Sequence, residues 1–211
     1  IGSYGGIAHI IADDRGMLIA AEGLFTISPD LKTILPNLAE SWSYSDDGRQ
    51  LTVTIRKGLK WSDGHPLTTE DILFTVNDLQ LNSNFMPITL PDFIGIELHA
   101  IDSWTFIINF PKPKPFFINY IAQSPEYFLM PKHYFSGFHP DYTNPDVIDE
   151  RMEELGFSSW SAFMTTSMQK RLFPDLVNHP TVSAFKIESL SPGLYSYHRN
   201  PYYFKVDSSG Q

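Results

Sequence analysis

Residues 36–79, PNLAESWSYSDDGRQLTVTIRKGLKWSDGHPLTTEDILFTVNDL, decide the fold of this chain. The first half alternates polar and apolar residues on both sides of an Asp-Gly pair. This pattern predicts a tight β-hairpin that turns at Gly48. In the return strand, residues 51–57, apolar side chains occupy one face and polar side chains the other. Such alternation is typical of an antiparallel sheet that is covered on one side.

The second half of this stretch predicts a capped helix. Thr68 is followed three residues later by Asp71, which matches a capping box in which an acid replaces the usual Glu or Gln. Ile72, Val76 and Leu79 then recur at the spacing of one helix face. The stretch as a whole therefore predicts two paired strands, a turn and a helix that begins near residue 68.

Further short strands and helices are expected outside this stretch, and together they predict a mixed α+β chain of the α/β class. The expected strands are residues 7–12, 95–101, 104–110, 183–189 and 194–199. The expected helices are residues 17–25, 116–122, 146–155 and 160–171, with Gly156 as a C-cap of the third. Turns are expected at residues 13–16 and 191–193, where Asp, Ser, Pro and Gly gather.

The composition narrows the class of protein. The chain has 211 residues, a formal net charge of −9 and no cysteine. An acidic balance argues against nucleic acid or an anionic membrane as the main partner, since both require a basic surface. The absence of cysteine excludes a disulfide framework, a thiolate metal site and a cysteine nucleophile. No apolar run approaches the roughly 20 residues of a membrane-spanning helix.

Signatures of catalysis are missing from the sequence. It contains no G-x-S-x-G, no phosphate-binding glycine loop, no dinucleotide fingerprint and no H-E-x-x-H. The adjacent acids Asp46 and Asp47 are explained by their place in a hairpin turn. The seven histidines lie far apart in the sequence, so a closed metal site is not expected. We therefore expect neither an enzyme nor a bound metal or cofactor.

Two apolar residues are candidates for a contact surface. Phe85 and Met86 follow a polar stretch and precede a proline, outside any regular apolar spacing. Large apolar side chains in such a loop are better contact candidates than those in a periodic segment. Trp61, in contrast, is interpreted as a core residue.

The words LAESW, SDDG and IRKGLKWSDGHPLTTED, in this order and spacing, resemble the signature of the family 5 solute-binding proteins. These are extracytoplasmic receptors that deliver oligopeptides, dipeptides and other solutes to ABC importers. Residues 96–117, 130–134 and 199–210 are also similar to segments of this family. The resemblance extends from residue 4 to residue 211.

The resemblance implies a periplasmic-binding-protein-like fold of class II, in which two α/β lobes close on a solute. Members of the family are considerably longer than this chain, so we expect an N-terminal fragment that contains part of lobe I. Residues 1–35 are expected to form the N-terminal part of lobe I. Residues 36–190 would form its inserted hairpin-and-helix subdomain, and residues 191–211 a return strand that leads to the second lobe.

The function implied by the resemblance is solute binding by lobe closure. We expect an oligopeptide as the solute, with a sugar or a metal complex as the alternative ligand. An ABC permease in the membrane is the expected partner, and the receptor is expected to be a monomer that binds no nucleic acid. Its location would be extracytoplasmic, in the periplasm or at the cell surface, with a lipid anchor as one form of attachment.

Site residues follow from the same resemblance. Glu22 and Leu24 are expected near the cleft, and Phe85 and Met86 are expected to approach the ligand. Two other functions stay open. One is the ligand-sensing module of a transcriptional regulator, and the other is an interaction domain that kept the fold and lost the ligand site.

Overall fold

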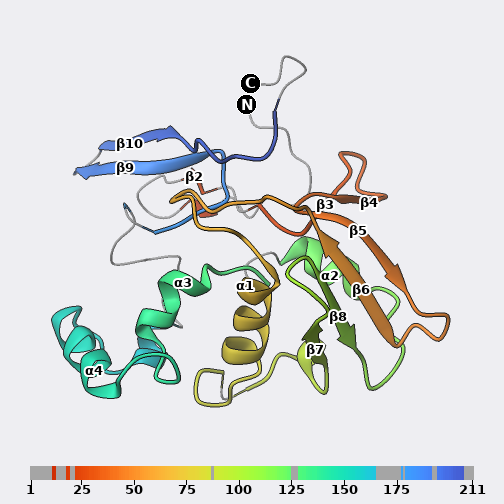
Figure 1. Cartoon of the computed structure of the whole chain (residues 1–211), viewed down its shortest axis with the longest axis horizontal. Helices are drawn as coiled ribbons and strands as arrows, with labels where there is room; N and C mark the ends of the chain where they lie inside the picture. The colour runs from red at the N-terminus through yellow and green to blue at the C-terminus, as the bar shows by residue number, and fades with distance from the viewer. Residues whose placement is uncertain are drawn as a thin grey trace.

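The structure is a computed structural model that describes residues 11–12, 18–19, 22–86, 88–124, 128–164, 177, 179–191 and 194–206. A four-stranded sheet lies on one side of helix α1, and helices α3 and α4 lie on the other (Figure 1). The ribbon formed by β9 and β10 lies at the top left of the same view. The chain thus has a sheet half and a helical half, with α1 between them.

The sheet is antiparallel and has the strand order β5-β6-β8-β7. Its strands are β5 (Ala39–Tyr44), β6 (Gln50–Ile55), β7 (Glu97–Ala100) and β8 (Thr105–Asn109). In β6 the side chains of Leu51, Val53 and Ile55 are fully buried and alternate with half-buried ones, which confirms the predicted one-sided pattern. The hairpin between β5 and β6 turns at Gly48, whose φ of 66° favours glycine.

Helix α1 (Thr69–Leu73) begins where the sequence predicts it. Thr68 and Asp71 form both bonds of a capping box: the Thr68 side chain accepts from the helix backbone, and Asp71 Oδ2 accepts from the Thr68 N–H at 2.9 Å. The helix then widens into the π-helical segment η1 (Phe74–Gln80), which the apolar spacing did not reveal. A box that satisfies two otherwise unpaired donors explains why this short helix is stable at its start.

Two apolar clusters form the core of the described residues. The larger joins the sheet, α1 and α2 (Phe117–Gln123), and contains Trp61, whose burial confirms its expected core role. The smaller joins η1 to α3 (Lys132–Phe135) and α4 (Pro145–Glu154). Because η1 contributes Val76 to the larger cluster and Phe74 and Leu79 to the smaller one, this helical segment joins the two halves.

The remaining elements are short. They are β1 (Ile11–Ala12) paired with β2 (Leu18–Ile19), β3 (Phe25–Ile27) paired with β4 (Ile34–Pro36), β9 (Phe185–Ser191) paired with β10 (Leu194–Arg199), and the 3-10 turns η2 (Pro91–Phe93) and η4 (Ser136–Phe138). The expected strands at 95–101, 104–110, 183–189 and 194–199 and the expected helices at 116–122 and 146–155 are confirmed. Gly156 follows the second of these helices at a φ of 73°, as expected of a C-cap.

One expected helix, residues 17–25, is wrong. Residues 18–19 form β2, and Phe25 begins β3, which pairs antiparallel with β4. Phe25 and Ile27 are buried on either side of the half-buried Thr26, which is strand periodicity. Pairing with a later segment overrides the local pattern here. The turns at 13–16 and 192–193, residues 7–10 of the first strand and residues 165–171 of the last helix lie outside the described residues.

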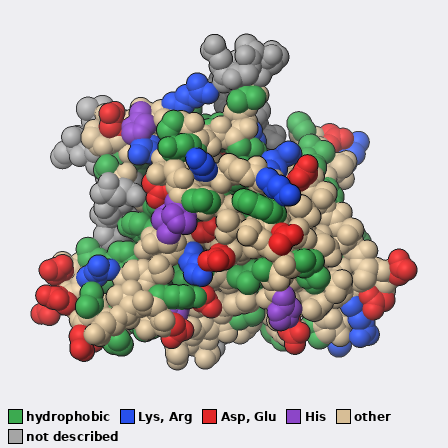
Figure 2. Space-filling view, viewed as in Figure 1, with side chains coloured by type: hydrophobic (Ala, Val, Ile, Leu, Met, Phe, Trp, Pro, Cys, Tyr) green, Lys and Arg blue, Asp and Glu red, His purple; other side chains and the backbone are tan. Residues whose placement is uncertain are grey.

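Charged side chains of both signs are spread over the face of the molecule shown in Figure 2. Figure 2 shows Asp and Glu side chains dispersed over the visible face, with a group over α4. On this face Lys and Arg are scattered among them, as expected from the net charge of −9. Among the described helices, none has the length and apolar character needed to cross a membrane.

Candidate functional site

Glu22 lies just before β3, and its carboxylate contacts three donor side chains. Its Oε1 accepts a hydrogen bond from Tyr203 Oη at 2.6 Å. Its Oε2 accepts from Asn37 Nδ2 at 2.8 Å and pairs with Lys205 Nζ at 2.7 Å. Burial and the bond to Glu22 both raise the pKa of the Tyr203 hydroxyl above its ordinary value, so this hydroxyl stays a donor. We call these four residues the Glu22 joint.

The segment that carries Tyr203 is held at two further points. Asn200 is 1% exposed, and its Nδ2 donates to the Ser183 carbonyl at 3.0 Å. The Tyr202 ring lies against the turn at Gly64, where an added Cβ would come within 3.0 Å of the Tyr202 hydroxyl oxygen. Residues 200–205 therefore contact both Glu22, near the N-terminal end of the described residues, and the turn at Gly64 within the 36–79 stretch.

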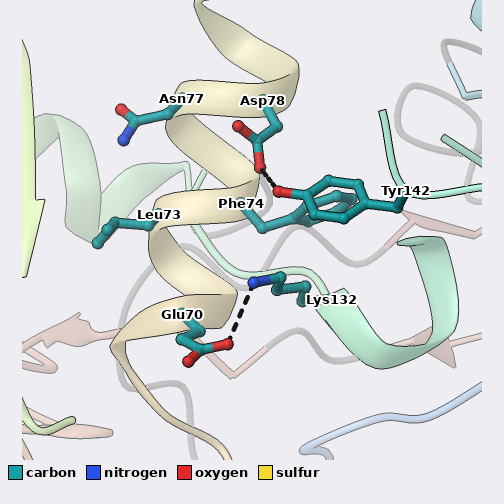
Figure 3. Close-up of a pocket in the computed structure, with 7 residues that line it drawn as sticks. All are labelled: Glu70, Leu73, Phe74, Asn77, Asp78, Lys132 and Tyr142. Atoms are coloured by element: carbon teal, nitrogen blue, oxygen red, sulfur yellow. Dashed lines mark hydrogen bonds and ion pairs between the residues drawn. The ribbon is translucent and has the colours of Figure 1, made fainter. Parts of the chain in front are cut away.

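A surface pocket of about 210 Å³ lies beside α1 and η1 (Figure 3). It is lined by Glu70, Leu73, Phe74, Asn77, Asp78, Lys132 and Tyr142, and we call it the helix pocket. Tyr142 Oη donates to Asp78 Oδ2 at 2.5 Å, and Lys132 Nζ pairs with Glu70 at 3.1 Å. The pocket is smaller than most small-molecule sites, and its charged groups already have partners within the chain.

Asp71 is a buried carboxylate with a structural role. Its Oδ2 accepts from the Thr68 N–H, and its Oδ1 accepts from the Lys132 N–H, each at 2.9 Å. Burial raises the pKa of Asp71, and the hydrogen bonds from the two backbone N–H groups oppose this rise. The carboxylate thus ties the start of α1 to the start of α3.

An imidazole and a carboxylate meet nearby. His133 Nε2 lies 2.7 Å from Asp63 Oδ2, and the His133 ring stacks on His65 with 3.9 Å between ring centroids. A catalytic triad requires a hydroxyl or thiol on the second ring nitrogen. His133 Nδ1 is buried without a hydrogen-bond partner in the described part of the chain. No group of three or more metal-binding side chains was found among the described residues either.

The four residues expected at the ligand lie in two places. Glu22 is in the joint, and Leu24, two residues later, is 1% exposed within the larger core. Phe85 is 2% exposed and stacks on Trp160, and Met86 packs against the same smaller core. Phe85 is therefore not the exposed contact that its sequence context favoured, because the turn at residues 82–86 folds it inward. The role of all four in ligand binding stays a prediction.

Sequence reasoning missed the partners of Glu22. Tyr203 and Lys205 stand 181 and 183 residues away, so no local spacing relates them to the carboxylate. The available signal was weak: an Asn-Pro pair followed by two tyrosines at the end of a strand, which marks a turn with aromatic contacts and nothing more specific.

Comparison with known proteins shows the family of this chain. Residues 33–210 match the family described as bacterial extracellular solute-binding proteins, family 5 middle. The periplasmic alpha-galactoside-binding protein of Rhizobium meliloti is 33% identical in an alignment of length 197 that covers 89% of this chain and 25% of that protein.

Two solved structures are similar over most of the chain. An oligopeptide-binding protein OppA is 32% identical with a TM-score of 0.79, over 90% of this chain and 30% of OppA. The periplasmic binding protein MelB of Agrobacterium fabrum, in complex with stachyose, is 29% identical with a TM-score of 0.70, over 90% of this chain and 28% of MelB.

The chain spans between 25% and 30% of the length of these three proteins. Its mixed α/β fold is that of a part of a periplasmic binding protein, as the sequence predicts. The profile match from residue 33 to residue 210 extends over nearly all of the described chain. The chain therefore belongs to the bacterial extracellular solute-binding proteins of family 5.

Proposed function

We propose that this chain is the N-terminal part of the extracytoplasmic solute-binding component of an ABC importer, and that its solute is a short peptide. The observation that carries the proposal is the family match over residues 33–210. The similarity to OppA, with a TM-score of 0.79, favours a peptide among the solutes of the family.

The proposed mechanism is capture by closure of two lobes around a solute, followed by delivery to a membrane permease. Residues 1–35 and 191–211 would belong to lobe I, and residues 36–190 to its inserted subdomain. The contact between Glu22 and Lys205 supports a common lobe for the first and last segments, because it joins them directly. We further propose that the receptor acts as a monomer.

An α-galactoside oligosaccharide is the second candidate solute. The alpha-galactoside-binding relative matches 89% of this chain at 33% identity, and MelB was solved with stachyose. The four expected ligand residues are buried or contact other parts of this chain, so the solute class is addressed by binding experiments.

The solute class is tested by thermal unfolding of the full-length receptor. A ligand that binds only the folded protein raises the unfolding midpoint by mass action. Pools of tri- to pentapeptides are compared with stachyose, and maltotetraose serves as the matched sugar without galactose. A rise with peptides supports the first candidate, and a rise with stachyose alone replaces it by the second. The absence of any rise with peptide, sugar or metal chelate would overturn solute capture.

We propose an extracytoplasmic location, which the periplasmic relatives support. Attachment through a lipid anchor is part of this proposal. Cell fractionation with and without globomycin-type inhibition of lipoprotein processing tests it. An upstream helix-turn-helix in the same reading frame would instead favour the sensing module of a regulator.

A further inference from the structure

We infer that Glu22 is a positioning residue: its carboxylate fixes the segment 200–206 in place and does not contact the solute. This inference rests on the proposed function, in which residues 191–211 lead to the second lobe. From the sequence, Glu22 is expected in the ligand site. We assign it instead to the point where the chain leaves lobe I for the second lobe.

The carboxylate has little capacity left for a solute. Two carboxylate oxygens offer about four acceptor positions. Three are used, by the Tyr203 hydroxyl, the Asn37 amide and the Lys205 ammonium group. The Glu22 side chain is only 15% exposed, so solvent and solute have narrow access to the fourth.

The three donors join parts of the chain that are far apart in the sequence. Asn37 stands 15 residues from Glu22, whereas Tyr203 and Lys205 stand 181 and 183 residues away. The Asn37 amide also donates to the Gly23 carbonyl at 2.8 Å, which holds the Glu22 backbone in position. Glu22 is thus a fixed acceptor to which the end of the described chain is bound.

The segment 200–206 has further contacts at its first residues, and it contacts Glu22 through its later residues. Asn200 is fastened to the backbone of residues 183 and 184, and Tyr202 to the turn at Gly64. Beyond Tyr202, the Tyr203 N–H donates to the Asn200 carbonyl at 3.2 Å within the same segment, and the Tyr203 and Lys205 side chains contact Glu22. Without the two contacts to Glu22, the described residues 203–206 would keep the Tyr203 backbone bond within the segment and ring contacts, such as that of Phe204 with the larger core.

The two contacts differ in weight. The Lys205 side chain is 46% exposed, and ion pairs open to solvent contribute little. Tyr203 is half-buried, and a hydroxyl that donates to a carboxylate forms one of the stronger kinds of hydrogen bond. We therefore expect Tyr203 to be the main partner through which Glu22 acts.

A direct consequence concerns solute affinity. If residues 203–206 become more mobile, the orientation of the second lobe relative to lobe I is less fixed. The closed state is then less populated. The apparent affinity then falls by the same factor for every solute, because only the closed state holds it tightly. Loss of a direct contact would instead depend on which solute is used.

Hydrogen exchange on the ligand-free, full-length protein tests the structural part of the inference. Glu22→Gln and Tyr203→Phe are each expected to speed amide exchange at Tyr203, whose N–H donates to the Asn200 carbonyl at 3.2 Å, about tenfold, the effect of one lost charge-assisted bond. The double variant is expected to be no faster than Glu22→Gln alone. Glu40→Gln, on an exposed position of β5, is the matched control and is expected to change nothing.

The outcomes separate this inference from the proposed function. Unchanged exchange at the Tyr203 amide in both variants would overturn the positioning role, whatever the protein binds. Because no solute is present, the exchange result stands even if neither peptide nor sugar binds. With a solute in hand, equal losses of affinity in Glu22→Gln and Tyr203→Phe support positioning. Loss in Glu22→Gln with wild-type affinity in Tyr203→Phe would make Glu22 a ligand contact and overturn the inference.

Discussion

The Glu22 joint and the helix pocket are built from the same pairings, yet they differ in burial. Each has a Lys–Glu ion pair and a tyrosine that donates to a carboxylate. The Glu22 side chain is 15% exposed, whereas that of Glu70 in the pocket is 73% exposed. Since water screens exposed charges, the hydrogen bond from the half-buried Tyr203 to the Glu22 carboxylate is expected to contribute more than the ion pair of the exposed Glu70.

The two sites also differ in what they connect. In the pocket, two carboxylates on one helical segment each serve one donor, from residues 132 and 142 (Figure 3). In the joint, one carboxylate serves both donors, and these lie at the other end of the described chain. A single substitution at Glu22 therefore affects the contacts with both Tyr203 and Lys205. A substitution at Glu70 affects the contact with Lys132 and leaves that between Asp78 and Tyr142.

The largest expected effect is that of Glu22→Gln on stability. The substitution leaves one oxygen for three donors, so the free energy of unfolding is expected to fall by about 2 kcal/mol. Urea unfolding of the full-length protein measures it. A fall of less than about 0.5 kcal/mol, the size typical of surface substitutions, would show that burial does not distinguish the two sites.

Gly64→Ala is expected to have the next largest effect, because it disturbs Tyr202, which directly precedes Tyr203 of the joint. The φ of 90° disfavours alanine, and the new Cβ would lie 3.0 Å from the Tyr202 hydroxyl oxygen. We expect a loss of about 1–2 kcal/mol in the same unfolding experiment. Gly58→Ala, also at positive φ but with nothing within 4 Å of the new Cβ, separates backbone strain from the contact with Tyr202.

Alkaline pH sharpens the comparison further. The pKa values of Tyr203 and Tyr142 are both raised by burial and then by the carboxylate that each hydroxyl contacts. An acid with a raised folded pKa contributes stability that is present below its unfolded pKa near 10 and is lost as the pH rises above it. Stability should therefore fall above about pH 10.

The two tyrosines should differ in this fall. Tyr203→Phe is expected to flatten it more than Tyr142→Phe, because Tyr203 is half-buried whereas Tyr142 is 45% exposed. The slope of the unfolding free energy between about pH 9.5 and pH 11 measures the difference. Equal slopes for the two variants would contradict it.

The smallest expected effect is that of Glu70→Gln. It breaks the ion pair with Lys132, but both side chains reach solvent, and pairs of this kind contribute about 0–1 kcal/mol. We expect a change in unfolding free energy within about 0.5 kcal/mol. A loss as large as that of Glu22→Gln would mean that the helix pocket contributes as much to stability as the joint.

The parts of the fold that the sequence predicts are those specified by neighbours in the chain. The alternation of Leu51, Val53 and Ile55 predicts β6, and Thr68 with Asp71 predicts the start of α1. What it does not predict depends on distant partners. Residues 25–27 form a strand because β4 pairs with them, and Glu22 meets Tyr203 across 181 residues. Phe85 is buried because a turn and the Trp160 ring enclose it.

The most direct test of the account is isothermal titration of the full-length receptor with the solute found in the unfolding screen, for the wild type, Glu22→Gln and Glu70→Gln. The account predicts wild-type affinity within about twofold for Glu70→Gln and affinity about tenfold weaker for Glu22→Gln, with the same factor for every solute that binds. Equal affinities for the two variants would contradict it, because the joint would then have no more influence on solute capture than an exposed ion pair.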